Sequence, residues 1–138
     1  MISNLVVARF RDGRTLKGTS LNVDPTKPTF HVRTPDQGAI EVRLVDLKAL
    51  FFVKDPTGNS AHQEATAPTF GDPRLVGGRK IAVKFDDRET IVGMANRFPP
   101  VGNYFFMLPI DPKSNNLRIL VNRAATVSIT EVTPAAVR

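Results

Sequence analysis

The residues most suited to chemistry are Asp86, Asp87 and Glu89, which could supply paired carboxylates for general acid–base catalysis. Neighbouring side chains on an extended strand point to opposite faces, so Asp86 and Asp87 are poorly placed to act on one substrate atom. The segment also lies between two apolar runs, where Asp residues are typical of a hairpin turn. We therefore interpret it as a solvated turn.

Metal and nucleophilic chemistry have little support. The two histidines, His31 and His62, lie far apart in the sequence, and cysteine is absent. Residues 111–116 offer oxygen ligands for Ca²⁺, but they lack the central Gly and the terminal Glu of an EF-hand loop, so we interpret them as a turn. The sequence predicts no catalytic residue, no metal site and no cofactor, and hence a protein that is not an enzyme.

The elements that hold these residues are predicted to come in two copies. An alignment of the sequence with itself at an offset of 75 residues needs no gap, and it pairs nine residues of the first copy with identical residues of the second. These are Phe10, Asp12, Thr15, Gly18, Pro25, Phe30, Asp36, Arg43 and Ala49. We expect one module at residues 1–54, a linker at 55–78, a second module at 79–132 and a tail at 133–138.

Apolar residues within each copy recur with a period of two, which predicts strands. Asp12 and Gly13 predict a tight hairpin, whereas Arg88 in place of a glycine predicts a different turn in the second copy. Gly18 and Gly93 predict a sharp bend in the second strand. Further strands are expected at 29–33, 40–44 and 50–53, with a helical turn at 45–48. The fold class is all-β, with two tandem five-stranded barrels of the SH3-like or Sm-like kind.

Residues 6–18 resemble the first motif of Sm-like RNA-binding proteins, but the loops with which that family binds uridine-rich RNA have no match here. A closer similarity is to an uncharacterised bacterial family of tandem small β-barrel modules. It rests on the Asp12-Gly13 hairpin with Gly18, on residues 46–55 and on residues 105–118. This resemblance implies the tandem fold and no activity.

The outward positions differ between the copies. They are polar in the first copy, whereas the second copy has Val92, Met94, Tyr104, Phe106 and Leu108 there. A strand that is apolar on both faces must be covered on both. Two interpretations stay open: this face packs on the first copy, against Phe51 or Phe52, or it docks another protein or a second copy of the chain.

The net charge of +6 and a pI near 10.2 favour anionic partners. The alternative function is therefore nucleic-acid binding through Arg9, Arg11, Lys17 and Arg33 on the first copy. Our preferred hypothesis is a protein-binding scaffold, an accessory subunit of a larger bacterial assembly. We expect no signal peptide and no transmembrane segment, and hence a location in the cytoplasm, either free or at the periphery of a membrane complex. The oligomeric state stays open.

Overall fold

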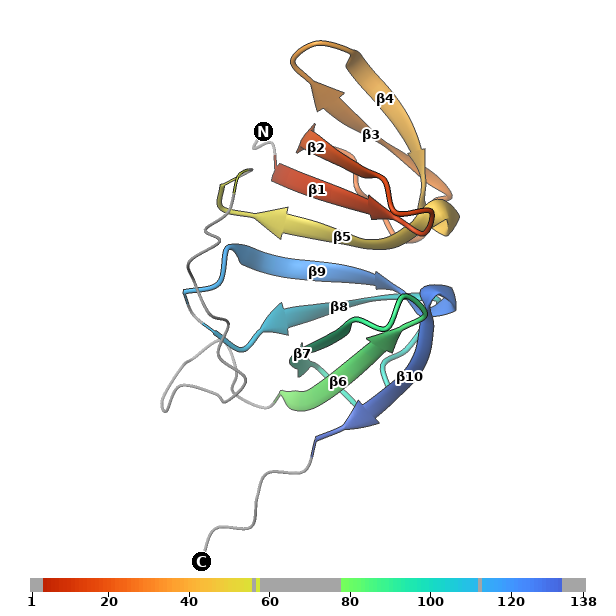
Figure 1. Cartoon of the computed structure of the whole chain (residues 1–138), viewed down its shortest axis with the longest axis vertical. Helices are drawn as coiled ribbons and strands as arrows, with labels where there is room; N and C mark the ends of the chain where they lie inside the picture. Colours follow the sequence, from red (N-terminus) through yellow and green to blue (C-terminus); the bar gives the residue numbers. More distant parts are fainter. Residues whose placement is uncertain (1–3, 56, 58–77, 112, 133–138) are drawn as a thin grey trace, which may run out of the picture.

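Ten β-strands account for most of the part of the chain that the structure describes, which confirms the prediction of an all-β chain (Figure 1). The computed structural model describes residues 4–55, 57, 78–111 and 113–132. Nearly all of the expected linker and the whole expected tail, together with His62, lie outside these residues.

The first five strands follow the expected order, and a single 3-10 turn, η1 (Leu44–Asp46), precedes the last of them. Alternation sets the buried side, since Val6 and Ala8 are at most 1% exposed. Gly13 closes the first hairpin at a φ of 95°, which suits a residue without a side chain. The strands are β1 (Asn4–Phe10), β2 (Thr15–Ser20), β3 (Thr29–Thr34), β4 (Gly38–Arg43) and β5 (Leu47–Val53).

The last five strands repeat this arrangement, again with a 3-10 turn, η3 (Arg123–Ala125), before the final strand. The prediction of a different turn at Arg88 is wrong. Arg88 adopts a φ of 77°, and its backbone N–H donates a hydrogen bond to the carbonyl oxygen of Phe85. In the first hairpin, the N–H of Gly13 donates to the carbonyl oxygen of Phe10 in the same way. The strands are β6 (Arg79–Phe85), β7 (Thr90–Ala95), β8 (Tyr104–Pro109), β9 (Asn116–Asn122) and β10 (Thr126–Glu131).

All ten strands belong to one open antiparallel sheet with the order β10-β6-β7-β8-β9-β5-β1-β2-β3-β4. Each half thus has its fifth strand beside its first, and the halves meet where β5 pairs with β9 (Figure 1). Leu50 stands opposite Leu120 at this junction. The boundary between the two expected barrels is therefore a pair of hydrogen-bonded strands.

The offset of 75 residues holds for only part of each half. Val6 and Ile81 are 75 residues apart, but their partners on the last strands, Phe52 and Glu131, are 79 apart. The difference arises in the turn from β8 to β9, which is longer than the turn from β3 to β4. An alignment without a gap therefore fails beyond the third strand of each half.

Gly18 and Gly93 lie where the second strand of each half comes very close to the backbone of the third. A Cβ atom on Gly18 would lie 2.3 Å from the carbonyl oxygen of Arg33, and one on Gly93 would lie 2.7 Å from that of Leu108. A side chain fits at neither position. The two glycines thus have a steric reason, the close approach of the neighbouring strand, and the sharp bend expected there stays a prediction.

The apolar side chains form two cores, and each core takes residues from both halves. The core of the first half includes Leu120 from β9, with Tyr104 packed against it. The core of the second half includes Ala49, Phe51 and Val53 from β5. Strand β5 is buried along its whole length because its two faces line different cores.

Candidate functional site

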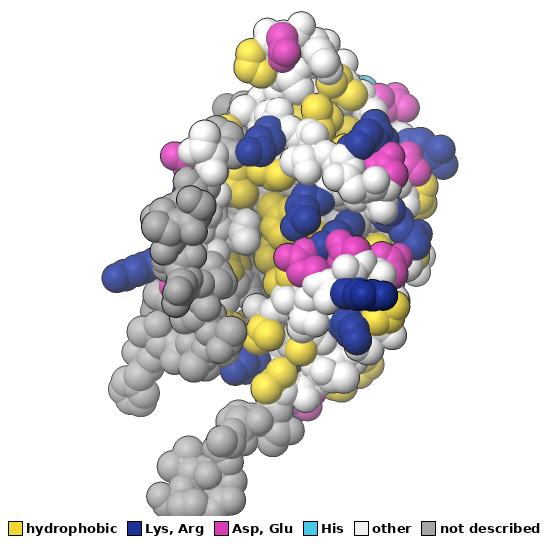
Figure 2. Space-filling view, in the orientation of Figure 1, with side chains coloured by type: hydrophobic (Ala, Val, Ile, Leu, Met, Phe, Trp, Pro, Cys, Tyr) yellow, Lys and Arg dark blue, Asp and Glu magenta, His cyan; other side chains and the backbone are white. Residues whose placement is uncertain are grey.

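Arg9 and Arg11, two of the four basic residues singled out for nucleic-acid binding, face the other half of the chain. Arg9 Nη1 lies 3.2 Å from Glu89 Oε1, and Arg11 Nη2 lies 3.2 Å from Asp86 Oδ2. Both carboxylates come from the hairpin between β6 and β7. Figure 2 shows these charge types meeting, with Asp and Glu side chains in a band across the middle of this face and Lys and Arg side chains beside it.

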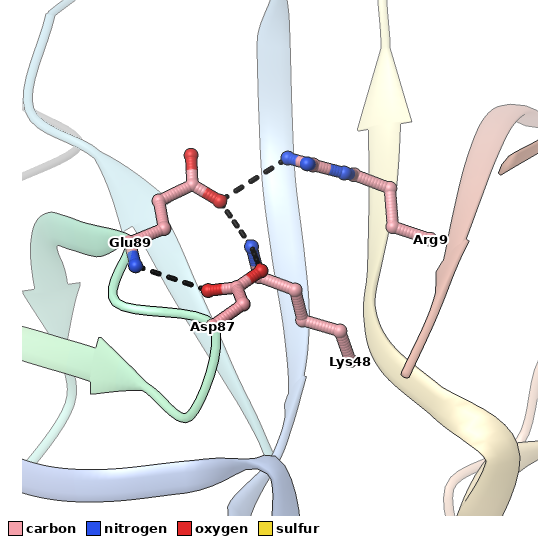
Figure 3. A network of polar contacts seen from close by, with 4 residues as sticks. All are labelled: Arg9, Lys48, Asp87 and Glu89. Carbon is pink, nitrogen blue, oxygen red and sulfur yellow. Dashed lines mark hydrogen bonds and ion pairs between the residues drawn. The ribbon is translucent and has the colours of Figure 1, made fainter. Parts of the chain in front are cut away.

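Lys48 on β5 lies at the centre of this contact and is only 3% exposed. Its Nζ lies 2.6 Å from Asp87 Oδ2, contacts Glu89 Oε1 and sits 4.8 Å from the centre of the Phe85 ring. Figure 3 shows Arg9 and Lys48 converging on Asp87 and Glu89. We name this group of four residues the junction network.

The turn itself orients the carboxylates of the junction network. Asp87 Oδ1 accepts a hydrogen bond of 3.0 Å from the backbone N–H of Glu89. The hydrogen bond from Lys48, together with this backbone bond, holds the pKa of Asp87 below its usual value. The expected solvated turn is thus half-exposed, and its carboxylates form ion pairs with residues of the first half of the chain. These ion pairs join the two halves.

The other two basic residues, Lys17 and Arg33, are exposed. They border an open groove of about 640 Å³ where β2 meets β3, and the groove is also lined by Leu5, Gly18 and Thr19. The structure therefore separates the four residues of the basic set. Arg9 and Arg11 contribute to the contact between the halves, and Lys17 and Arg33 face a groove.

The five apolar residues predicted as an interface differ in exposure. Met94 is buried, Val92, Tyr104 and Leu108 are half-buried, and Phe106 remains 37% exposed. Tyr104 packs against the core of the first half. The ring of Phe106 lies 6.1 Å from that of Phe52 on β5. One part of this face therefore packs on the first half, and Phe106 marks where it becomes accessible.

Phe106 lies beside exposed residues that sequence reasoning missed. Arg118 on β9 places its guanidinium 4.6 Å from the centre of the Phe106 ring. Val101, 64% exposed, borders with Phe106 a shallow pocket of about 270 Å³, which Arg97 also lines. We name Arg97, Val101, Phe106 and Arg118 the Phe106 surface. Arg118 was hidden because the alignment without a gap placed it opposite Arg43.

Lys48 was also missed, although it left a signal. It interrupts the apolar run from Leu47 to Val53, and a buried ammonium requires carboxylate partners. The acidic turn at 86–89 could have supplied them.

The candidates for metal chemistry form no cluster in the described ranges. No group of three or more His, Asp or Glu side chains there could hold a metal ion. Ser114 and Asp111 are buried within the 111–116 turn, where the backbone N–H of Lys113 donates to Asp111 Oδ1. His31 bonds to Asn22 on the surface. Among the described residues, no helix has the length and hydropathy to cross a membrane.

One protein family has a profile that matches residues 3–133, and its description is a family of unknown function, DUF6982. No curated protein and no solved structure matches the chain.

Proposed function

The chain belongs to the DUF6982 family, whose function is unknown, and we propose that it is a non-enzymatic protein-binding module that serves as an accessory subunit of a larger bacterial assembly. The architecture we propose is a tandem pair of SH3-like or Sm-like barrels that arose by duplication. Support comes from the equal strand order of the halves, the 3-10 turn before each last strand and the matching first hairpins.

The observation that carries this proposal is the exposure of Phe106 and Val101 beside well-packed neighbours. An aromatic residue that is ordered yet partly exposed contributes strongly to protein interfaces, because its burial removes apolar area from water at a small cost in side-chain entropy. Phe52 and Arg118 pack against the Phe106 ring. A partner could bury the part of Phe106 that is still exposed.

A second candidate function is binding of RNA or single-stranded DNA at the groove bordered by Lys17 and Arg33. These two cations have no carboxylate partner among the described ion pairs. Because Arg9 and Arg11 are already paired, the basic surface is smaller than the sequence predicts, and phosphate binding needs several cations. This observation favours a protein partner.

Affinity purification of the tagged protein from its native host, with and without nuclease, separates the two functions. We expect protein partners that survive nuclease and are lost from a Phe106→Asp variant. Val127→Asp is the matched control, because Val127 is an apolar residue 61% exposed on the same half. Partners that disappear with nuclease, or that Phe106→Asp retains as fully as Val127→Asp does, would refute protein binding at this surface.

A further inference from the structure

Arg118 differs from the other arginines that stack on aromatic rings in the described residues. Arg9 and Arg14 each contact a ring and also a carboxylate, Glu89 at 3.2 Å and Asp12 at 2.7 Å respectively. The guanidinium of Arg123 lies over the Phe105 ring, and its Nε donates a hydrogen bond of 2.9 Å to the carbonyl oxygen of Gly102. Each of these three guanidinium groups therefore has an oxygen acceptor within the chain.

The guanidinium of Arg118 is held in place by two rings. Its central carbon lies 4.2 Å from the centre of the Phe52 ring and 4.6 Å from that of Phe106. It is exposed, and no acceptor for its N–H groups is found among the described residues. Contact with the ring faces orients the planar group, and its edge donors point to no acceptor in the described ranges. Such an edge matches the two oxygens of a carboxylate.

The surroundings of Arg118 restrict what can bind there. Phe106 offers apolar contact next to the guanidinium, and the pocket that Phe106 lines also contains exposed Val101 and Arg97, a second exposed cation. A ligand that matches this pattern carries a carboxylate beside an apolar side chain. Nucleic acid fits less well, because two cations are few for a phosphate backbone.

We infer that the Phe106 surface binds a linear acidic segment of a partner protein, in which an Asp or Glu side chain pairs with Arg118 and an adjacent apolar side chain covers Phe106. This inference rests on the proposed protein-binding function and specifies the chemistry of the partner. The fixed orientation of Arg118 lowers the entropy cost of a two-point hydrogen bond.

The test uses the full chain and a phage-displayed library of random twelve-residue peptides. We expect enrichment of peptides with Asp or Glu next to an aromatic or aliphatic residue. For a synthetic copy of an enriched peptide, Arg118→Gln should raise the Kd at least tenfold and Arg118→Lys by less, since Lys keeps the charge and loses the planar donor pair. Arg14→Gln is the matched control, because Arg14 also stacks on a ring but has its own carboxylate; it should change the Kd less than twofold.

The outcomes separate this inference from the proposed function, provided that circular dichroism and the urea midpoint show each variant to be folded. Peptides without carboxylates, or acidic peptides that bind Arg118→Gln as tightly as the wild type, would overturn the inference. If Phe106→Ser weakens those same peptides, the protein-binding function stands. The absence of any enriched peptide, or binding that neither variant affects, would count against both.

Discussion

Lys48 shows how one buried charge can fix two parts of a chain together. It lies on β5, yet both carboxylates it contacts come from the hairpin of the other half. Lys48 is 3% exposed, whereas the side chains of Asp87 and Glu89 are 46% and 42% exposed. Removing the carboxylates should therefore cost more stability than removing the ammonium, because water can reach an unpaired carboxylate more easily than an unpaired Lys48.

This inequality gives a prediction for stability. The double variant Asp87→Asn/Glu89→Gln leaves Lys48 buried without a carboxylate and should lower the free energy of unfolding by about 2 kcal/mol. Lys48→Met leaves two half-exposed carboxylates that water can solvate, so the loss should be about 1 kcal/mol or less. Urea denaturation followed by circular dichroism measures both. A larger loss for Lys48→Met would show that the network depends on something other than the buried ammonium.

The lowered pKa of Asp87 predicts how stability depends on pH. A carboxyl whose pKa is lower in the folded state contributes stability above its unfolded pKa, near 3.8, and this contribution is lost as the pH falls through the folded value. The difference in unfolding free energy between the wild type and Asp87→Asn should thus be constant from pH 5 to 7 and shrink below pH 4. A difference that stays constant down to pH 2.5 would mean that Asp87 titrates alike in both states.

Among the elements, β5 and β9 determine how the halves are joined. Leu120 on β9 lies in the core of the first half and is 2% exposed, while Leu117 on the same strand is 52% exposed. Leu120→Ala should lower the free energy of unfolding by about 2–4 kcal/mol, because it removes apolar contacts and leaves a cavity. Leu117→Ala should change it by less than about 0.5 kcal/mol. Equal losses in urea denaturation would argue against the packing of β9 on the first half.

Local signals predicted the strands well and their connection poorly. The period of two located the strands near 29–33 and 50–53, observed at Thr29–Thr34 and Leu47–Val53. Hydrogen bonds between β5 and β9 join residues roughly 70 positions apart, and the sequence of neither segment indicates with which strand it pairs. The insertion before β9 shifted the alignment, and this shift concealed Arg118. For the same reason Arg9 and Arg11 resembled a free basic face, since their partners lie in the other half.

At the scale of the whole molecule, the halves share both their sheet and their cores. Each core contains side chains of the other half, and the junction network joins them across the hairpin. The outer strands, β4 and β10, carry Glu41, Arg43 and Glu131. Charged residues on edge strands oppose the addition of further strands. Binding of a partner is therefore better served by the Phe106 surface.

The most direct test of that role is crosslinking in the native host with the photoreactive residue p-benzoyl-phenylalanine at position 106, compared with the same residue at position 127. We expect adducts with a protein at position 106, resistant to nuclease and absent at position 127, which is exposed and outside the Phe106 surface. No adduct at position 106, adducts that nuclease removes, or the same adducts at both positions would contradict a protein-docking role for this surface.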